Sequence, residues 1–304
     1  MASASAGSTA VGPRVDGDSR PRRPRAVPAW LWAVPPVAGL GLVFLYPLVL
    51  VVKQSFSPDA GGHSAKPWSQ VFQEQSFRKA LWNTVWIAAG STAGCLVLGF
   101  LLALVIAFVP FPGGKVLSRF IDIFLAFPSF LITLALLFIY GTVGMANGLW
   151  TDATGAAAGP VDFLHTPWGV LLAEVTYFTP FVMRPLLAAF SQVDTAQLEA
   201  ASSLGARAPR IVRQVILPEA LPSLAAGGGL VLVLCLNEFG IVLFTGAKNT
   251  TTLPMLVYSK AILDGDYPGA CVVAVVSVVL SVSLYGLYRV LVARTTGGAR
   301  RAGA

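Results

Sequence analysis

Charge is the property that this sequence has least of. Only 12% of its 304 residues are charged and 55% are hydrophobic, whereas about 25% of the residues of an average soluble domain are charged. The hydrophobic residues come in blocks of roughly 20 or more, which is the length that a helix needs to cross a bilayer. Barrel strands would give alternating segments of ~10 residues, which the sequence lacks. We therefore predict an all-α polytopic membrane protein.

Residues that carry catalysis or bind metals are also scarce. The two histidines, His63 and His165, lie between hydrophobic blocks, and the three cysteines, Cys95, Cys235 and Cys271, lie inside them. Their spacing matches neither a metal site nor a disulfide framework, and no HExxH, Gly-x-Ser-x-Gly or paired-acid motif is present. We expect no catalytic residue, no metal site and no cofactor bound by this chain, which disfavours an intramembrane enzyme.

A phosphate-binding Walker loop is missing as well. The run Gly227-Gly228-Gly229 is not followed by Lys and Ser or Thr. We interpret it as a face for close helix packing rather than as a phosphate cradle. Any energy from ATP must then come from another polypeptide. A membrane scaffold or sensor is an alternative function that these absences leave open.

Six hydrophobic blocks predict six transmembrane helices, at about residues 28–52, 84–109, 120–140, 168–190, 222–245 and 269–292. Lys and Arg are enriched in cytoplasmic segments. Of the 21 basic residues, 15 lie in the N-terminal tail, in the segments around 115–119 and 184–213, and at the C-terminal end. Both termini and the loop between the fourth and fifth blocks are therefore expected to be cytoplasmic. The net charge of +7 is explained by the basic residues of the cytoplasmic segments, so it does not indicate a nucleic-acid partner.

The loop before the fifth hydrophobic block contains a specific pattern of residues. It reads Glu199-Ala200-Ala201-Ser202-Ser203-Leu204-Gly205 and, nine residues later, Val215-Ile216-Leu217-Pro218. The loop is helix-prone, and it carries Arg207, Arg210 and Arg213 with no acid between them. A segment that only connects two transmembrane helices does not need such a residue pattern. We therefore interpret the loop as a docking element for another protein.

This loop resembles the EAA loop of permease subunits of binding-protein-dependent (type I) ABC importers. The family pattern is Glu-Ala-Ala, three residues, Gly, nine residues, Ile, one residue and Leu-Pro. The chain matches it at Glu199, Ala200, Ala201, Gly205, Leu217 and Pro218, and Val215 at the Ile position keeps β-branched apolar bulk. The resemblance implies a MetI-like core of five helices over residues 83–293, with the coupling loop at about 194–221. The span at 28–52 looks like an extra N-terminal helix.

Residues 1–27 and 294–304 are expected to be cytoplasmic tails, the first of them basic and disordered because it is rich in Ala, Ser, Gly, Pro and Arg. The resemblance implies a place in the bacterial cytoplasmic (inner) membrane. It also implies four kinds of partner: a dimer of ABC ATPase subunits that binds ATP and Mg, a second permease subunit of identical or related sequence, a periplasmic or lipid-anchored solute-binding protein, and membrane lipid.

The resemblance also implies how the loop works. In the family it forms two short helices that meet near the Gly and sit in a groove of the ATPase. Gly205 is suited to a flexible or left-handed turn. Pro218 is expected to end the second helix and to restart the chain into the fifth span. Closure of the ATPase dimer would move the loop, and the loop would move the spans around a site near the midplane.

Two acids, Glu174 and Glu238, are predicted to lie within the membrane, where acids are costly and tend to face a cavity, a partner or a polar path. Each has two interpretations: it lines the translocation path, or it makes a buried hydrogen bond that fixes helix packing. Pro128, Pro180 and Pro185 each remove a backbone hydrogen bond and can kink a helix, which suits a pathway that opens on alternate sides.

The substrate is suggested by further resemblances. The segment Asn237-Glu238-Phe239-Gly240 is similar to one shared by permeases for sulfate, molybdate, polyamines, ferric iron and 2-aminoethylphosphonate. Residues 126–130, 144–150 and 179–181 look most like permeases for 2-aminoethylphosphonate. We expect an importer of this phosphonate, with a polyamine or ferric-iron importer as the alternative. Glu238 or Glu174 would face the substrate ammonium, with Asn237 on the same path.

Overall fold

The computed structural model describes residues 29–57, 66–162, 164–248 and 250–302. All regular structure in these ranges is helical, as predicted. The chain divides into two compact units, residues 1–48 and 49–304. In the first unit the described residues belong to helix α1 (Ala29–Gln54). The predicted tail of residues 1–27 lies outside the described residues.

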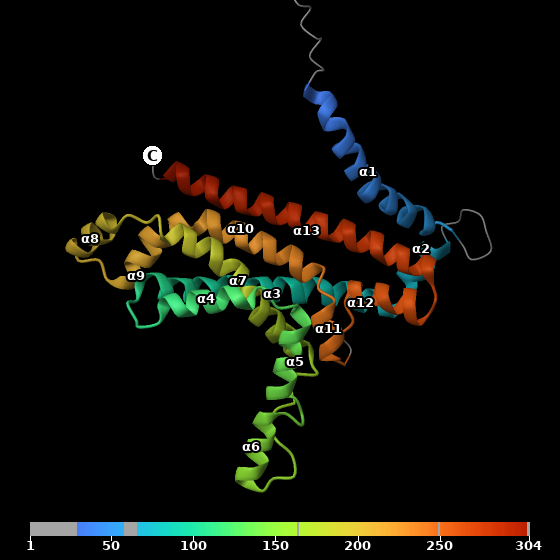
Figure 1. The fold of residues 1–304 in the computed structure, drawn as a ribbon, viewed down its shortest axis with the longest axis horizontal. Coiled ribbons are helices and arrows are strands. Elements are labelled where there is room, and N and C mark those ends of the chain that lie inside the picture. Colours follow the sequence, from blue (N-terminus) through green and yellow to red (C-terminus); the bar gives the residue numbers. More distant parts are fainter. Residues whose placement is uncertain (1–28, 58–65, 163, 249, 303–304) are drawn as a thin grey trace, which may run out of the picture. The chain divides into compact units, whose positions relative to one another are not determined.

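The second unit holds the remaining helices (Figure 1). They are α2 (Lys66–Gln73), α3 (Gln75–Phe108), α4 (Gly114–Phe124), α5 (Ser129–Tyr140), α6 (Met145–Thr154), α7 (Pro167–Phe190), α8 (Thr195–Ser203), α9 (Ala208–Ile211), the π-helical turn η1 (Val212–Ile216), α10 (Leu217–Leu236), α11 (Gly240–Thr245), α12 (Leu253–Tyr258), the π-helical turn η2 (Ser259–Leu263) and α13 (Tyr267–Ala302).

Six helical stretches in the described ranges are long and apolar enough to cross a membrane. They are Trp32–Gln54, Gln75–Phe108, Ser129–Thr154, Pro167–Phe190, Ala208–Leu236 and Tyr267–Arg294. The number of predicted spans is therefore confirmed, and the first, fourth and sixth fall close to their predicted positions. The second ends as predicted but begins at Gln75, nine residues before the predicted start.

The third and fifth spans differ from the prediction. Residues 120–140 are not one helix, because α4 ends at Phe124 and α5 begins at Ser129. Pro128 lies between them in extended backbone, and a proline also disfavours helical geometry at the residue before it. The predicted fifth span, 222–245, starts earlier in the structure and is interrupted after Leu236, so that 240–245 form the separate helix α11.

The core of the second unit lies between α3, α7 and α10, which pack against one another along their lengths. Side chains such as Cys95, Val182 and Leu236 are fully buried there. The run Gly227-Gly228-Gly229 is buried on α10 and faces both α7 and α13. A Cβ added at Gly227 would lie 3.2 Å from the Cα of Val182. The predicted packing face is thus confirmed, since a larger side chain would push the helices apart.

A smaller core joins α2, α12 and the first turns of α3 and α13. A charged network crosses this region: Nζ of Lys260 lies 2.8 Å from Oε1 of Glu74 and 3.2 Å from Oδ2 of Asp266. The Lys260 side chain is only 8% exposed. Burial lowers the pKa of Lys260, but the hydrogen bonds and charges of Glu74 and Asp266 outweigh that effect and hold this pKa above its usual value.

Candidate coupling loop and intramembrane site

The Glu-Ala-Ala motif lies in helix α8, at the end of the second unit where α9 and α10 begin (Figure 1). Asp194 starts this helix, because its Oδ1 accepts a hydrogen bond of 2.9 Å from the backbone N–H of Ala196. A capping carboxylate satisfies an N–H group that the helix leaves without a partner. Glu199, Ala200 and Ala201 therefore stand in the second turn of a short capped helix.

Gly205 makes the turn between α8 and α9. Its φ of +79° lies in the left-handed region, which glycine adopts without the strain that a Cβ brings. Helix α9 follows from Ala208 to Ile211. The expected pair of short helices meeting near Gly205 is thus present.

The helix pair has an open surface. No residue of α8 or α9 is buried, and Leu204, beside the turn, is 88% exposed. Glu199, Arg207 and Arg210 are exposed as well. The side chains at the turn between the two short helices are therefore accessible from outside this chain.

The second half of the motif lies where α9 runs into α10. The turn Val212–Ile216 is π-helical, and the backbone N–H of Leu217 donates to the carbonyl of Val212, five residues earlier. Pro218 does not end the helix, contrary to expectation: helical structure continues from Ala208 to Leu236. Because Pro218 has no N–H to donate, the wider π turn is the place where it is tolerated. Val215 is half-buried in this turn.

Glu238 follows the end of α10 and ties two helices together. Its Oε1 accepts hydrogen bonds from Oγ of Ser129, at 3.1 Å, and from the backbone N–H of Ile241, at 2.9 Å. These contacts join the first residue of α5 to the first turn of α11. Nδ2 of Asn237 donates to the carbonyl of Val233 at 2.8 Å. Of the two interpretations of Glu238, the packing hydrogen bond is present in the structure.

Glu174 is buried on α7, facing α3 and α10, and only 1% of its surface is exposed. The side chains of Ser91 on α3 and Cys235 on α10 lie beside its carboxyl group. Neither Oε2 of Glu174 nor Oγ of Ser91 has a hydrogen-bond partner among the described residues. A buried polar atom without a hydrogen-bond partner is costly, so Glu174 is a position where the packing of α3, α7 and α10 is not optimised for stability.

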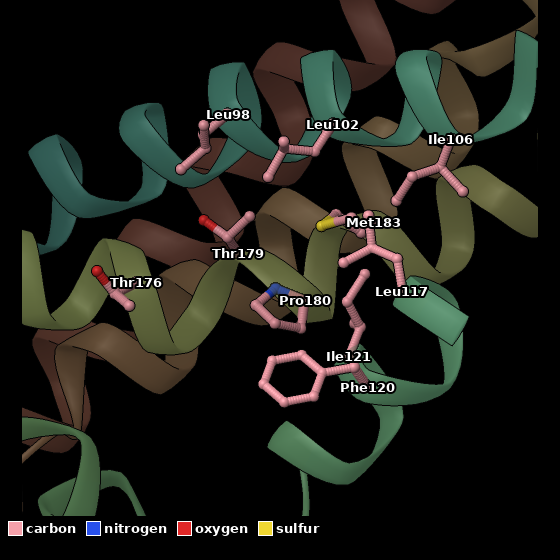
Figure 2. Close-up of a pocket in the computed structure, with 10 residues that line it drawn as sticks. All are labelled: Leu98, Leu102, Ile106, Leu117, Phe120, Ile121, Thr176, Thr179, Pro180 and Met183. Carbon is pink, nitrogen blue, oxygen red and sulfur yellow. The ribbon is translucent and has the colours of Figure 1, made fainter. Parts of the chain in front are cut away.

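A separate cavity of about 230 Å³ lies between α3, α4 and α7 (Figure 2). Two threonines reach it from α7, and both hydroxyl groups are already used: Thr176 donates to the carbonyl of Leu172 and Thr179 to that of Val175. The rest of the lining is apolar, and Phe120, Pro180 and Met183 are among its labelled side chains in Figure 2. None of the residues that line this cavity is charged, so it offers no counter-charge to an ionic solute.

Two further residues have contacts that the sequence does not reveal. Ser129 belongs to the segment 126–130 that resembles phosphonate permeases, but nothing in the sequence indicates that it contacts Glu238, 109 positions away. Asn147, in the first turn of α6, is buried against the segment before this helix and the loop after it. Its Nδ2 donates to the carbonyls of Gly141, Thr142 and Val161 at 2.7–3.1 Å, and its Oδ1 accepts the Val161 N–H at 2.9 Å. Side chain-to-backbone bonds of this kind leave no periodic pattern in a sequence.

The chain resembles known proteins along most of its length. A family model described as "Binding-protein-dependent transport system inner membrane component" matches residues 95–297. PhnU of Salmonella typhimurium, a proposed 2-aminoethylphosphonate transport system permease protein, is 51% identical over 265 residues, which are 87% of this chain and 93% of PhnU. PotC of Haemophilus influenzae, a spermidine/putrescine transport system permease protein, is 27% identical over 82% of this chain and 91% of PotC.

Solved structures share the fold. A chain of a bacterial ABC transporter that imports the acidic polysaccharide alginate superposes with a TM-score of 0.75 at 18% identity, over 88% of this chain and 96% of that chain. A chain of the MetNI methionine ABC transporter, in an inward-facing conformation, gives a TM-score of 0.51 at 21% identity, over 72% and 94% of the two chains.

Proposed function

Because the chain belongs to the family of binding-protein-dependent transport system inner membrane components and is a permease subunit of an ABC importer, we propose that it forms half of a translocation pore for 2-aminoethylphosphonate. A second permease subunit, identical or related, completes the pore. The subunits lie in the bacterial cytoplasmic membrane with both termini in the cytoplasm, as the distribution of Lys and Arg favours. The chain itself is a transport component without an ATPase site.

The coupling loop is the observation that carries the mechanism. Its two short helices leave Leu204 and Glu199 exposed, and α9 continues through η1 into the long helix α10. We propose that Glu199, Ala200, Ala201, Gly205, Val215, Leu217 and Pro218 form or support the surface that docks into a separate ATPase subunit. Binding of ATP and Mg to a dimer of that subunit moves the loop, and the continuous helix carries the movement into the membrane.

The substrate proposal rests on sequence. Identity to PhnU is 51% over most of both chains, against 27% to PotC. A solute-binding protein, periplasmic or lipid-anchored, delivers the phosphonate from outside. The phosphonate carries an ammonium group, and we propose that Glu238, Asn237 and Glu174 line the path it follows. Glu238 is half-buried beside the end of α10, and Glu174 has an oxygen without a partner.

A polyamine or ferric iron is the second candidate for the substrate. The similarity to PotC over 82% of this chain favours a polyamine, and the two acids suit any cationic solute. A polyamine has no anionic group, whereas the phosphonate is anionic at one end. The substrate that stimulates ATP hydrolysis therefore separates the two candidates.

The test is the ATPase rate of the complete transporter in liposomes. The complex contains this permease, its partner permease, the ATPase and the binding protein, and it receives 2-aminoethylphosphonate, spermidine, putrescine or ferric iron. We expect stimulation by the phosphonate alone. Stimulation by a polyamine or by iron would overturn the substrate, and failure to assemble with any ATPase would overturn the coupling role.

Glu199→Ala is the matched variant for the coupling loop. We expect it to abolish uptake and substrate-stimulated ATP hydrolysis while the amount of protein in the membrane stays normal, because Glu199 is exposed and makes no contact that the fold needs. Gln197→Ala, on the same exposed helix but outside the motif, is the control. Equal transport by both variants and the native chain would contradict docking through Glu199.

A further inference from the structure

A second cavity lies between α10 and α13, and none of the residues that line it is an acid. It has a volume of about 400 Å³ and contains more polar surface than the cavity of Figure 2. Helix α10 contributes its floor, including Gly229, and α13 contributes Tyr285, Tyr288 and Arg289. The two helices pack side by side (Figure 1), and the cavity lies at their interface.

The floor of the cavity depends on glycine. A Cβ added at Gly229 would lie 3.2 Å from ring carbons of both Tyr285 and Tyr288, so any other residue would push against the rings. The ring of Tyr288 is fixed, because its hydroxyl donates to the carbonyl of Ala225 at 2.9 Å. A concave space bounded by glycine and held aromatic rings is a built site rather than a loose surface.

Two hydrogen-bond donors at this cavity have no partner among the described residues. Tyr285 and Arg289 are four residues apart on α13 and therefore share one face. Both are exposed, and neither forms a hydrogen bond or an ion pair with a described residue. A guanidinium group and a phenol hydroxyl together supply the donors that bind phosphate oxygens.

The depth of the cavity matches the level of lipid headgroups. Arg289 follows Tyr267, the first residue of α13, by 22 positions, which is about 33 Å at 1.5 Å per residue. That length is close to the ~30 Å of the hydrocarbon core. If Tyr267 stands at one interface, Arg289 stands at the other, where a lipid phosphate lies.

The charge of the neighbourhood favours a lipid over another helix. Residues 29–54, which form α1 in this chain and would do so in a second copy, contain no Asp or Glu to pair with Arg289. The acid closest in sequence to the α10 side of the cavity is Glu219, one turn before Pro222; it does not line the cavity and forms no ion pair with Arg289. A basic cavity between transmembrane helices at the cytoplasmic surface suits a phospholipid headgroup.

We propose that this cavity binds the phosphate group of a phospholipid, with Arg289 and Tyr285 as its donors. The assignment to the cytoplasmic leaflet rests on the orientation proposed above, whereas the binding itself does not. A lipid held there would lie against α10, the helix that continues from the coupling loop, and would brace that helix against α13.

The test is retention of phosphatidylglycerol by the purified full-length transporter, measured by native mass spectrometry after delipidation and titration with the lipid. We expect Arg289→Gln to lower the affinity for the first bound lipid about fivefold, which corresponds to about 1 kcal/mol for one basic residue at a membrane surface. Arg294→Gln, an exposed arginine on the same helix outside the cavity, is the control and should leave that affinity unchanged.

Three outcomes would overturn the proposal. Equal losses in the Arg289 and Arg294 variants would mean unspecific attraction, and no loss in either would remove Arg289 as a ligand. Release of the lipid by inorganic phosphate would mean that a free anion is the natural occupant. Tyr285→Phe keeps the ring and removes only the hydroxyl, so a loss of lipid in this variant without a change in elution volume supports binding rather than misfolding.

Discussion

At the scale of single residues, Gly205 is the position where the structure most clearly requires one residue type. Beyond its two chain neighbours, no described atom lies within 4 Å of a Cβ built on Gly205, so a lack of space is not the reason for glycine here. The requirement comes from the backbone, whose φ of +79° costs most residues about 1–2 kcal/mol. Asn is the residue that tolerates this region best after glycine.

We therefore expect Gly205→Ala to abolish or strongly reduce uptake while membrane insertion stays normal, because α8 and α9 can no longer meet at the same angle. Gly205→Asn, which is larger but accepts the left-handed geometry, should keep most of the activity. Uptake assays with matched expression levels check both variants. If Ala were tolerated and Asn were not, side-chain size rather than backbone geometry would control the loop.

Lys260 gives a prediction about pH. Its pKa in the folded protein is held above the usual value by Glu74 and Asp266, against the effect of burial. A raised pKa contributes stability that is fully present below the pKa of the unfolded chain and is lost as the pH rises through the folded pKa. Thermal stability in detergent should therefore be insensitive to this group from neutral pH to about pH 10 and should fall at higher pH.

The variant Lys260→Met tests the origin of that fall. It should lower stability at neutral pH by about 1–3 kcal/mol, as expected for hydrogen bonds to charged groups, and it should weaken the alkaline loss. Melting curves of the native chain and the variant between neutral and alkaline pH measure both effects. An identical alkaline loss in the variant would assign it to other groups.

At the scale of elements, the junction after α10 is held by one carboxyl oxygen. Oε1 of Glu238 accepts from Ser129 on α5 and from the first turn of α11, and the rings of Phe130 and Phe244 stack beside it with centroids 5.1 Å apart. Helices α5 and α11 therefore depend on the end of α10 for their relative position.

We expect Ser129→Ala to lower the amount of substrate transported per ATP hydrolysed, because movement of α10 would reach α5 less directly. The cost in stability should be modest, about 1 kcal/mol for one hydrogen bond. Ser129→Thr keeps the hydroxyl and should restore the ratio. The measurement is simultaneous uptake and ATP hydrolysis in proteoliposomes, and an unchanged ratio in Ser129→Ala would separate this hydrogen bond from transport.

The sequence predicts elements that depend on composition and local pattern. Six apolar blocks and the motif from Glu199 to Pro218 are of this kind, and the six spans and the helix pair follow from them. The sequence does not predict where α10 ends. It also does not predict that the helix continues through Pro218, because a π turn has no distinctive composition. Contacts between distant positions, such as Ser129 with Glu238, are set by how helices pack and leave no periodic signal.

At the scale of the whole molecule, two exposed positions report its orientation in the membrane. Val143, between α5 and α6, is fully exposed, and Leu204 in the coupling loop is 88% exposed. With positive residues in the cytoplasm, Val143→Cys should react with a membrane-impermeant maleimide on intact cells, and Leu204→Cys only after permeabilisation. The reverse pattern would invert the proposed topology.

The same pair of variants tests assembly. Leu204→Cys should be protected when the ATPase subunit is present in the membrane and reactive when it is absent, since the loop would then be uncovered. Val143→Cys, on the opposite side, should react equally in both cases. Equal reactivity of Leu204→Cys with and without the ATPase would mean that the loop tip is not buried by that partner.

The π turn at Val212–Ile216 has a consequence for the length of the chain. A π turn holds about one residue more than the α-helical turn it replaces, so removing one residue within Val212–Ile216 would restore an α-helical turn with little change in the angular phase of the helix on either side. Removing one residue from the regular part of α10 would instead rotate everything beyond it by about 100°. Single-residue deletions should therefore be tolerated at the π turn and rejected a turn or two further on, which makes the wide turn the place where this stretch of the gene can change in length.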